Sequence, residues 1–311
     1  MLHLLSTFRS MPWALEPAVM SLVCGIVDRW ASGVRLSAED IAAAIGDSPE
    51  AAARRAEQSR AMSGAGVAVM PVYGVLAHRA YAVANTSRPL TSTEALAGQY
   101  RALMADPDVG TIVLDIDSPG GSVFGVQELA DTMAALRGQK RVVAVANNTA
   151  ASGAYWIASQ ADSIVVTPSG MVGSIGVIVP HTDLSAAYEQ AGIKRTYITY
   201  GRYKAEGNDT GPLDDEARAN LQQLVDTYGG AFTSAVAKGR RAAGAQVSVE
   251  DVRGEAFGEG RMRLAADAVA KRMADDVATL DQVVARERRQ SSKRGGMSAE
   301  TARRHIEILE T

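Results

Sequence analysis

The pattern of apolar and polar positions changes at residues 63–66, Ser-Gly-Ala-Gly, and this change divides the chain in two. Before it, helix-start signals precede predicted helices at residues 17–31 and 51–62, and a third signal lies at residues 37–40. After it, short apolar runs rich in β-branched residues alternate with longer stretches of helical character. We therefore predict an N-terminal helical extension followed by a larger α/β domain.

The second part predicts a parallel sheet with helices between its strands. A continuous apolar run such as residues 111–116 is typical of a parallel strand that is buried on both faces. Predicted strands cover residues 67–76, 111–116, 142–146, 163–167 and 177–179. Predicted helices cover residues 92–104, 123–136, 152–161, 184–191 and 214–241. This alternation favours an α/β fold with right-handed crossovers.

Composition sets the expected boundaries of these parts. We expect the helical extension at residues 1–63, the α/β domain at residues 64–285 and a charged tail at residues 286–311. The tail holds seven Lys or Arg residues against four Glu, and residues 291–296 have the composition of a linker. Such a tail suits either attachment to a partner or a solvated terminus.

The overall composition is that of an ordinary globular protein. Hydrophobic residues make up 47% and charged residues 22% of the chain, and the net charge of -3 gives no bias toward nucleic acid or an acidic membrane surface. A single cysteine, Cys24, excludes an internal disulfide framework and fits a reducing compartment. The four scattered histidines suggest no metal cluster. We expect neither a nucleic-acid partner nor a bound metal.

The apolar stretch at residues 11–27 is too short and too interrupted to span a bilayer. It contains Pro12, Glu16 and Pro17, whereas a membrane helix needs about 20 apolar residues. It also lacks the basic start and the small-residue cleavage site of a signal peptide. We therefore expect a cytoplasmic protein without a membrane partner.

Three segments carry candidate chemistry. Asp-Ser-Pro-Gly-Gly at residues 117–121 follows a predicted strand, and its glycines suit either an oxyanion site of backbone N–H groups or a plain strand-to-helix turn. Ser152 lies among small residues at the start of a predicted helix, where a serine is either a helix cap or a nucleophile. Lys204 follows the strand-like residues 195–200 in a glycine-flanked loop. A lysine there is either a solvated surface charge or, where burial leaves its amine uncharged, a general base.

Four motifs, taken in their order and spacing, resemble the signal peptide peptidase A family. They are Asp-Ser-Pro-Gly-Gly at 117–121, Thr-Ala-Ala-Ser-Gly-Ala-Tyr-Trp-Ile-Ala at 149–158, Gly-Ser-Ile-Gly-Val at 173–177, and Lys204. The resemblance extends from about residue 67 to residue 284, because residues 254–261 and 274–281 are similar to the closing segment of that family. It implies a serine endopeptidase on a ClpP/crotonase-like α/β fold.

The resemblance implies a role for five residues of this chain. Position by position, Ser152 matches the nucleophile, Lys204 the general base, and Ser174 a serine that supports the lysine amine. Gly121 and Gly153 match the residues whose backbone N–H groups form the oxyanion hole. The resemblance further implies an acyl-enzyme, a ring-like homo-oligomer, and a reaction that needs no metal or other cofactor.

The leader Met-Pro-Trp-Ala-Leu at residues 11–15 resembles that of the shorter family members encoded by tailed phages and prophages. Those members resemble capsid-maturation proteases. This implies a protein or peptide substrate, with capsid scaffold and portal proteins as expected partners. The expected location is then the host cytoplasm or the phage procapsid.

Other interpretations of the sequence stay open at this stage. His181 follows Ser152 by 29 residues, so a Ser152–His181–Asp triad, completed by Asp183 or Asp209, competes with the Ser–Lys arrangement. A general cytoplasmic peptide-degrading protease of the same family is a second alternative. A crotonase-type acyl-CoA enzyme and a non-catalytic assembly protein on the same fold are two more.

Overall fold

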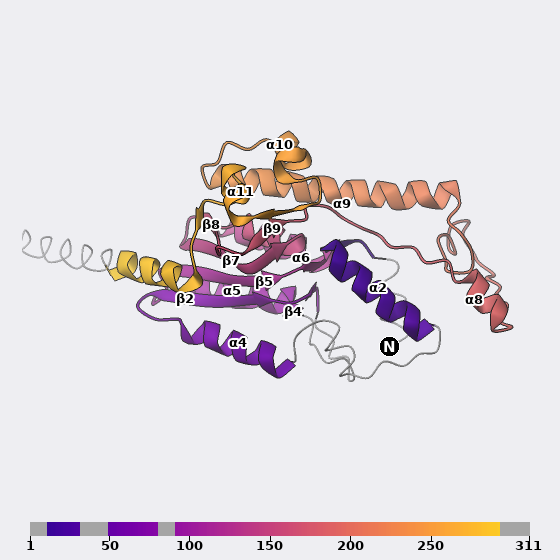
Figure 1. Cartoon of the computed structure of the whole chain (residues 1–311), viewed down its shortest axis with the longest axis horizontal. Helices are drawn as coiled ribbons and strands as arrows, with labels where there is room; N and C mark the ends of the chain where they lie inside the picture. The colour runs from indigo at the N-terminus through magenta and orange to yellow at the C-terminus, as the bar shows by residue number, and fades with distance from the viewer. Residues whose placement is uncertain (1–10, 32–48, 80–90, 293–311) are drawn as a thin grey trace, which may run out of the picture.

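The computed structural model describes residues 11–31, 49–79 and 91–292 (Figure 1). Its centre is a mixed sheet in which four strands run parallel, each paired with the next: β2 (Val67–Tyr73), β5 (Thr111–Ser118), β7 (Arg141–Ala151) and β8 (Ser163–Val166). Three short strands extend it: β9 (Met171–Gly173) parallel to the end of β7, β10 (Met262–Leu264) antiparallel to β9, and β11 (Asp276–Val277) parallel to β8. The predicted α/β fold class is confirmed.

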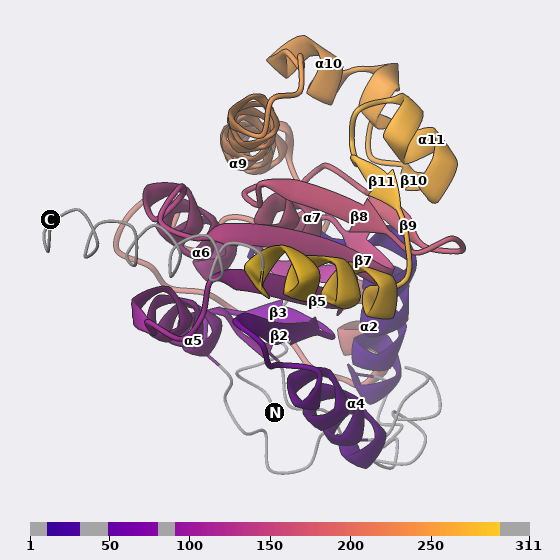
Figure 2. The same ribbon diagram turned by 90° about the vertical axis from the view of Figure 1, so that its left-hand side faces the viewer.

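Both faces of this sheet are buried, which explains the continuous apolar runs. On β5, Ile112 and Leu114 belong to the larger core cluster and Val113 to a smaller one, as the alternation of side chains along a strand requires. The larger cluster includes residues of α5 (Thr93–Ala105), α6 (Val123–Ala135), α7 (Gly153–Ala158) and α9 (Asp215–Ala242). The smaller cluster includes residues of a helix at 280–292. Figure 2 shows α5 and α6 together on one side of the sheet.

The remaining helices surround this core. They are α2 (Pro17–Ala31), α4 (Pro49–Ala61), α8 (Ser185–Gln190), α10 (Val249–Arg253), α11 (Ala265–Ala270) and a 3-10 turn at Glu255–Phe257. α4 packs against β2, and its Arg55 guanidinium donates a hydrogen bond of 3.0 Å to the Asp117 carboxylate at the end of β5. The helical extension predicted at residues 1–63 therefore contacts the sheet within its described part.

A second, smaller sheet holds the glycine turn that precedes α6. Its strands lie in the order β1 (Trp13–Leu15), β6 (Gly120–Ser122), β3 (Leu76–Ala77) and β4 (Thr91–Ser92). β1 is antiparallel to β6, with Trp13 opposite Ser122 and Leu15 opposite Gly120. A strand that the sequence did not predict thus ties the N-terminal segment to the α/β domain.

Most predicted elements are confirmed, and two are wrong. Residues 177–179 form no strand, although Ile178 makes an isolated bridge with Trp13. Residues 195–200 are exposed and form no strand either. The helix start predicted at residues 37–40 lies outside the described residues.

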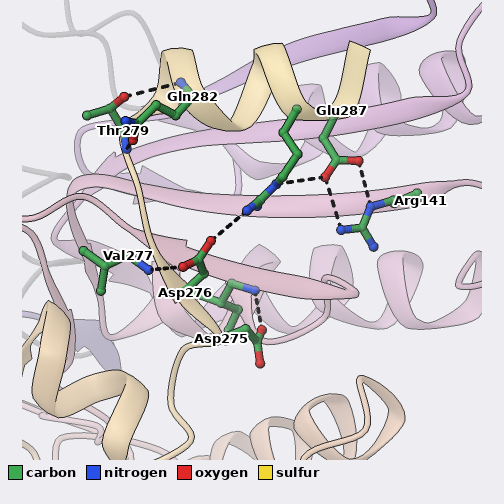
Figure 3. A network of polar contacts seen from close by, with 9 residues as sticks. Arg141, Asp275, Asp276, Val277, Thr279, Gln282 and Glu287 are labelled. Carbon is green, nitrogen blue, oxygen red and sulfur yellow. Dashed lines mark hydrogen bonds and ion pairs between the residues drawn. The ribbon is translucent and has the colours of Figure 1, made fainter. Parts of the chain in front are cut away.

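The last described helix is held by a buried ion pair (Figure 3). The Glu287 carboxylate has no solvent exposure and accepts hydrogen bonds of 2.8 and 3.2 Å from the Arg141 guanidinium on β7. Arg286 donates a hydrogen bond of 2.7 Å to Asp276, and this bond lowers the pKa of that carboxyl. The helix therefore continues past residue 285, where composition places the start of the tail.

We expect Glu287→Gln to lower the free energy of unfolding by about 2 kcal/mol, because the partly buried Arg141 guanidinium would lose its charged partner while the side-chain volume stays the same. Urea denaturation of the full chain measures this loss. Asp281→Asn, at an exposed position of the same helix, is the control and should change the stability by less than about 0.5 kcal/mol. Equal effects of the two substitutions would show that the pair does not hold the helix.

Candidate active site

Ser152 stands at a sharp turn between β7 and α7. Its backbone has φ 52° and ψ -119°, a conformation that costs a residue with a side chain on the order of 1–3 kcal/mol. It occupies the N-cap position of α7, yet its side chain makes no capping hydrogen bond. The helix-cap interpretation is therefore wrong. The hydroxyl instead lies 3.5 Å from the Gly176 carbonyl oxygen, and the whole residue is buried.

The two predicted oxyanion glycines lie side by side next to Ser152. A Cβ placed on Gly153 would lie 3.5 Å from the backbone nitrogen of Gly121. A Cβ placed on Gly121 would lie only 2.0 Å from the Leu76 carbonyl oxygen, so glycine alone fits at position 121. The close approach of β6 to β3 therefore accounts for one glycine of the motif at 117–121, and it brings the backbone of that motif to the start of α7.

Ser174 reaches the same place through the neighbouring strand. The register of β7 and β9 pairs Ala151 with Gly173, so Ser152 and Ser174 are the next residues on adjacent strands. The Ser152 N–H donates to the Gly173 carbonyl oxygen at 2.7 Å, and Ser174 is 4% exposed. Four of the five predicted site residues thus come together at one edge of the sheet.

Lys204 lies elsewhere in the chain's own fold. It is exposed, and its backbone N–H donates to the Gly201 carbonyl oxygen within the connection between α8 and α9. Figure 1 shows α8 and this connection beyond the end of the sheet, at the N-terminal end of α9. Ser152 and Lys204, both described in the structure, form no hydrogen bond with each other. The Ser152–Lys204 dyad therefore stays a prediction.

The residues just before Lys204 form an exposed apolar surface, which we call the 193–203 segment. Its large apolar side chains face solvent to an unusual extent, with Ile198 96% exposed. The others are Ile193, Tyr197, Tyr200 and Tyr203. Exposed apolar runs of this kind are typical of surfaces that contact another protein, a membrane or a ligand.

The competing triad is not assembled. His181 places Nε2 3.2 Å from the Gly211 carbonyl oxygen, Asp183 accepts a hydrogen bond from the Ser185 N–H, and Ser185 lowers the pKa of that carboxyl. Asp209 accepts hydrogen bonds from Tyr188 at 2.6 Å and Arg195 at 3.2 Å. The His181 ring thus contacts a backbone carbonyl, and no hydrogen bond joins it to Ser152 in the described part of the chain.

A polar cluster lies at the ends of β2, β5 and β7, on the side of α4. The Asp115 carboxylate, which is 1% exposed, accepts hydrogen bonds from Tyr73 and Asn147. Burial raises the pKa of the neighbouring Asp117 carboxyl, and the hydrogen bond from Arg55 opposes that rise. These contacts fix Asp117, the first residue of the glycine turn, against α4.

The model of Peptidase family S49 matches residues 134–293, which is more than half of the chain and includes Ser152, Ser174 and Lys204. The chain belongs to Peptidase family S49. This membership confirms the resemblance to signal peptide peptidase A and agrees with the ClpP/crotonase-like α/β fold.

Phage proteins are among the relatives of this S49 chain. The Head-tail preconnector protein GP5 of Enterobacteria phage P21 is 38% identical over 172 residues, 55% of this chain and 34% of its own length. The Capsid assembly protease C of Escherichia phage lambda is 33% identical over 234 residues, 72% of this chain and 53% of its own length. Protease 4 of Salmonella typhi is 29% identical over 191 residues, 61% of this chain and 30% of its own length. The chain therefore spans about half the length of the phage lambda protein and about a third of the length of the other two.

The described residues contain no helix long and apolar enough to cross a membrane. They also contain no group of three or more His, Cys, Asp or Glu side chains placed to hold a metal ion.

Proposed function

We propose that this S49 chain is a serine endopeptidase that uses a Ser152–Lys204 dyad and an acyl-enzyme. The uncharged amine of Lys204 takes the proton from the Ser152 hydroxyl, whose oxygen attacks the scissile carbonyl. The backbone N–H groups of Gly121 and Gly153 stabilise the oxyanion, and Ser174 supports the lysine amine. The protonated lysine returns its proton to the leaving amine, and water activated by the same amine then hydrolyses the ester.

The observation that carries this proposal is the position of Ser152. Ser152 is buried at positive φ, makes no capping bond and lies next to two glycine backbones, and this combination supports the role of nucleophile. The relatives named as proteases support the same chemistry.

We infer that Lys204 reaches Ser152 of a neighbouring copy of the chain. Lys204 is exposed next to the apolar 193–203 segment. Ser152, in contrast, is buried within its own chain at the turn between β7 and α7. Docking of that segment on an adjoining subunit would cover its apolar side chains and desolvate the lysine amine, which favours the uncharged form. The proposed assembly is therefore a homo-oligomer, in agreement with the ring that the family resemblance implies.

We propose capsid, scaffold or portal proteins as the substrates, cleaved in the host cytoplasm or inside the procapsid. The names of two relatives refer to capsid assembly and to a head-tail preconnector, which supports this choice over general peptide degradation.

Coexpression with candidate capsid proteins, followed by mass spectrometry of their termini, tests this choice of substrate. New termini that appear with wild type and not with Ser152→Ala are expected. Identical termini with both would favour a non-catalytic assembly role.

We expect His181→Ala to retain at least about half of the wild-type kcat/KM on any cleaved peptide, because its ring contacts a backbone carbonyl and no catalytic group. Lys204→Ala measured beside it provides the contrast. A loss of about 1,000-fold or more in His181→Ala, with Lys204→Ala active, would replace the dyad by a histidine-based triad.

A further inference from the structure

Residues 12–16 run through the candidate active site as an extended strand. The register of β1 and β6 places Ala14 opposite Gly121. Two positions away on each side, the Val123 N–H donates to the Pro12 carbonyl oxygen at 3.2 Å and the Glu16 N–H to the Pro119 carbonyl oxygen at 2.9 Å. Hydrogen-bonded pairs alternate with non-bonded pairs in an antiparallel ladder. Ala14 and Gly121 therefore stand at a hydrogen-bonding position, where the Ala14 carbonyl faces the Gly121 nitrogen.

The other edge of this strand is paired as well. The Trp13 N–H donates to the Ile178 carbonyl oxygen and the Ile178 N–H to the Trp13 carbonyl oxygen, both at 2.9 Å. β1 is thus held between β6 and the segment that follows Ser174. A strand bound by backbone hydrogen bonds between two chain segments is the way in which an extended peptide is recognised.

The Ala14 carbonyl lies beside the glycine backbones of the predicted oxyanion hole. A Cβ placed on Gly120 would lie 2.2 Å from the Ala14 carbonyl oxygen and 2.8 Å from the Gly153 nitrogen, so this carbonyl lies at the predicted oxyanion hole. A Cβ placed on Gly153 would lie 3.2 Å from the same oxygen. Ala14 and Ser152 are both 0% exposed. A separate peptide cannot reach the hydroxyl while β1 remains in place.

We propose that residues 12–16, Pro-Trp-Ala-Leu-Glu, are an internal substrate mimic that occupies the peptide groove and must leave before a substrate enters. The groove accordingly takes an extended peptide with an alanine-sized residue at the position of Ala14 and large apolar residues on both sides of it. This proposal rests on the proposed peptidase function and names both its regulation and its substrate class.

The strand is built so that it can leave without opening the domain. β1 is three residues long, and its Trp13 and Leu15 belong to a small apolar cluster with Met20 of α2. That cluster is separate from the two clusters that cover the faces of the central sheet. Ala14 is the one residue of β1 that belongs to the larger cluster, so displacement of the strand exposes the groove and removes a single small side chain from that core.

Peptide binding tests the proposal without requiring catalysis. The probe is a fluorescent peptide of sequence Pro-Trp-Ala-Leu-Glu with blocked ends, and fluorescence anisotropy measures its affinity for the full chain carrying Ser152→Ala. Adding Ala14→Arg prevents β1 from seating, because that side chain has no space, and should tighten peptide binding at least about tenfold. The control Ala18→Arg, at an exposed position of α2, should bind the peptide as the parent does.

A reversible lock gives a second measurement if Ala14→Arg impairs folding. Trp13 and Ser122 stand at a non-hydrogen-bonded position of the ladder, where side chains approach closely, so Trp13→Cys with Ser122→Cys should form a disulfide in a Cys24→Ser background. The oxidised protein should lose peptide binding at least about tenfold, and a reductant should restore it.

Two results would overturn the proposal: equal affinity of Ala14→Arg and its parent, or equal affinity of the oxidised and reduced forms. Absence of peptide binding in every form would overturn it too. These binding measurements depend neither on Lys204 nor on peptide hydrolysis. Peptide cleavage that depends on Ser152 but is indifferent to β1 would therefore refute the mimic and leave the peptidase standing.

Discussion

Replacing Ser152 with alanine should abolish acyl-enzyme formation and lower kcat/KM by roughly 10⁴-fold or more. The reason is that the nucleophile forms the covalent bond that the other groups only assist, so oxyanion N–H groups without it leave a small residual rate. Labelling by a fluorophosphonate and cleavage of a peptide that wild type cuts measure the two parts of this loss. The alanine fits the buried space and should leave the thermal unfolding transition within a few degrees of wild type.

Ser169→Ala is the matched control for that experiment, because Ser169 is an exposed serine in the same part of the chain. It should be labelled and should cleave the peptide at the wild-type rate. Labelling that persists in Ser152→Ala and disappears in another serine variant would move the nucleophile away from the turn between β7 and α7. Activity that survives in Ser152→Ala without any serine label would exclude an acyl-enzyme altogether.

The long buried strands could be predicted because their signal is local. The continuous apolar run of β5 reflects burial on both faces, and the structure places its alternate side chains in two clusters. The short strands could not be predicted in this way. β6 consists of Gly-Gly-Ser, which has little strand propensity, and it forms because the neighbouring β1 and β3 pair with it. Residues 177–179 show the converse. They are β-branched, but their one bridge joins Ile178 to Trp13, and they form no strand.

The candidate site divides in the same manner. Ser152, Ser174 and Gly121 follow from short motifs, and parallel pairing of β7 with β9 brings the two serines to adjacent strand ends. The position of Lys204 could not be predicted from a motif. It lies in the connection between α8 and α9, and no local sequence pattern indicates which surface that connection contacts. The role of Ala14 was missed for a related reason. A three-residue apolar strand has no periodic signal, and its meaning appears only when its partner β6 is known.

Mixing two inactive variants should restore activity if Lys204 acts on the neighbouring subunit. Ser152→Ala and Lys204→Ala should each be inactive alone, since one lacks the nucleophile and the other the base. Coexpressed in equal amounts, they form mixed oligomers in which a site works when its serine comes from one variant and its lysine from the other. With random assembly, about one quarter of the sites contain both an intact serine and an intact lysine. The expected kcat per site is therefore about one quarter of the wild-type value.

Coexpression of Ser152→Ala with the double variant Ser152→Ala/Lys204→Ala is the control, and it should stay inactive because no site has a serine. Lys194→Ala, an exposed lysine of the same connection, should be active alone. If the mixture of single variants stays inactive while mixed oligomers are shown to form, the lysine acts within its own chain and the α8–α9 connection must fold back on β7. If Lys204→Ala is active alone, the base is a different group. Recovery near one quarter would instead show that the exposed 193–203 segment completes the active site only when two copies meet.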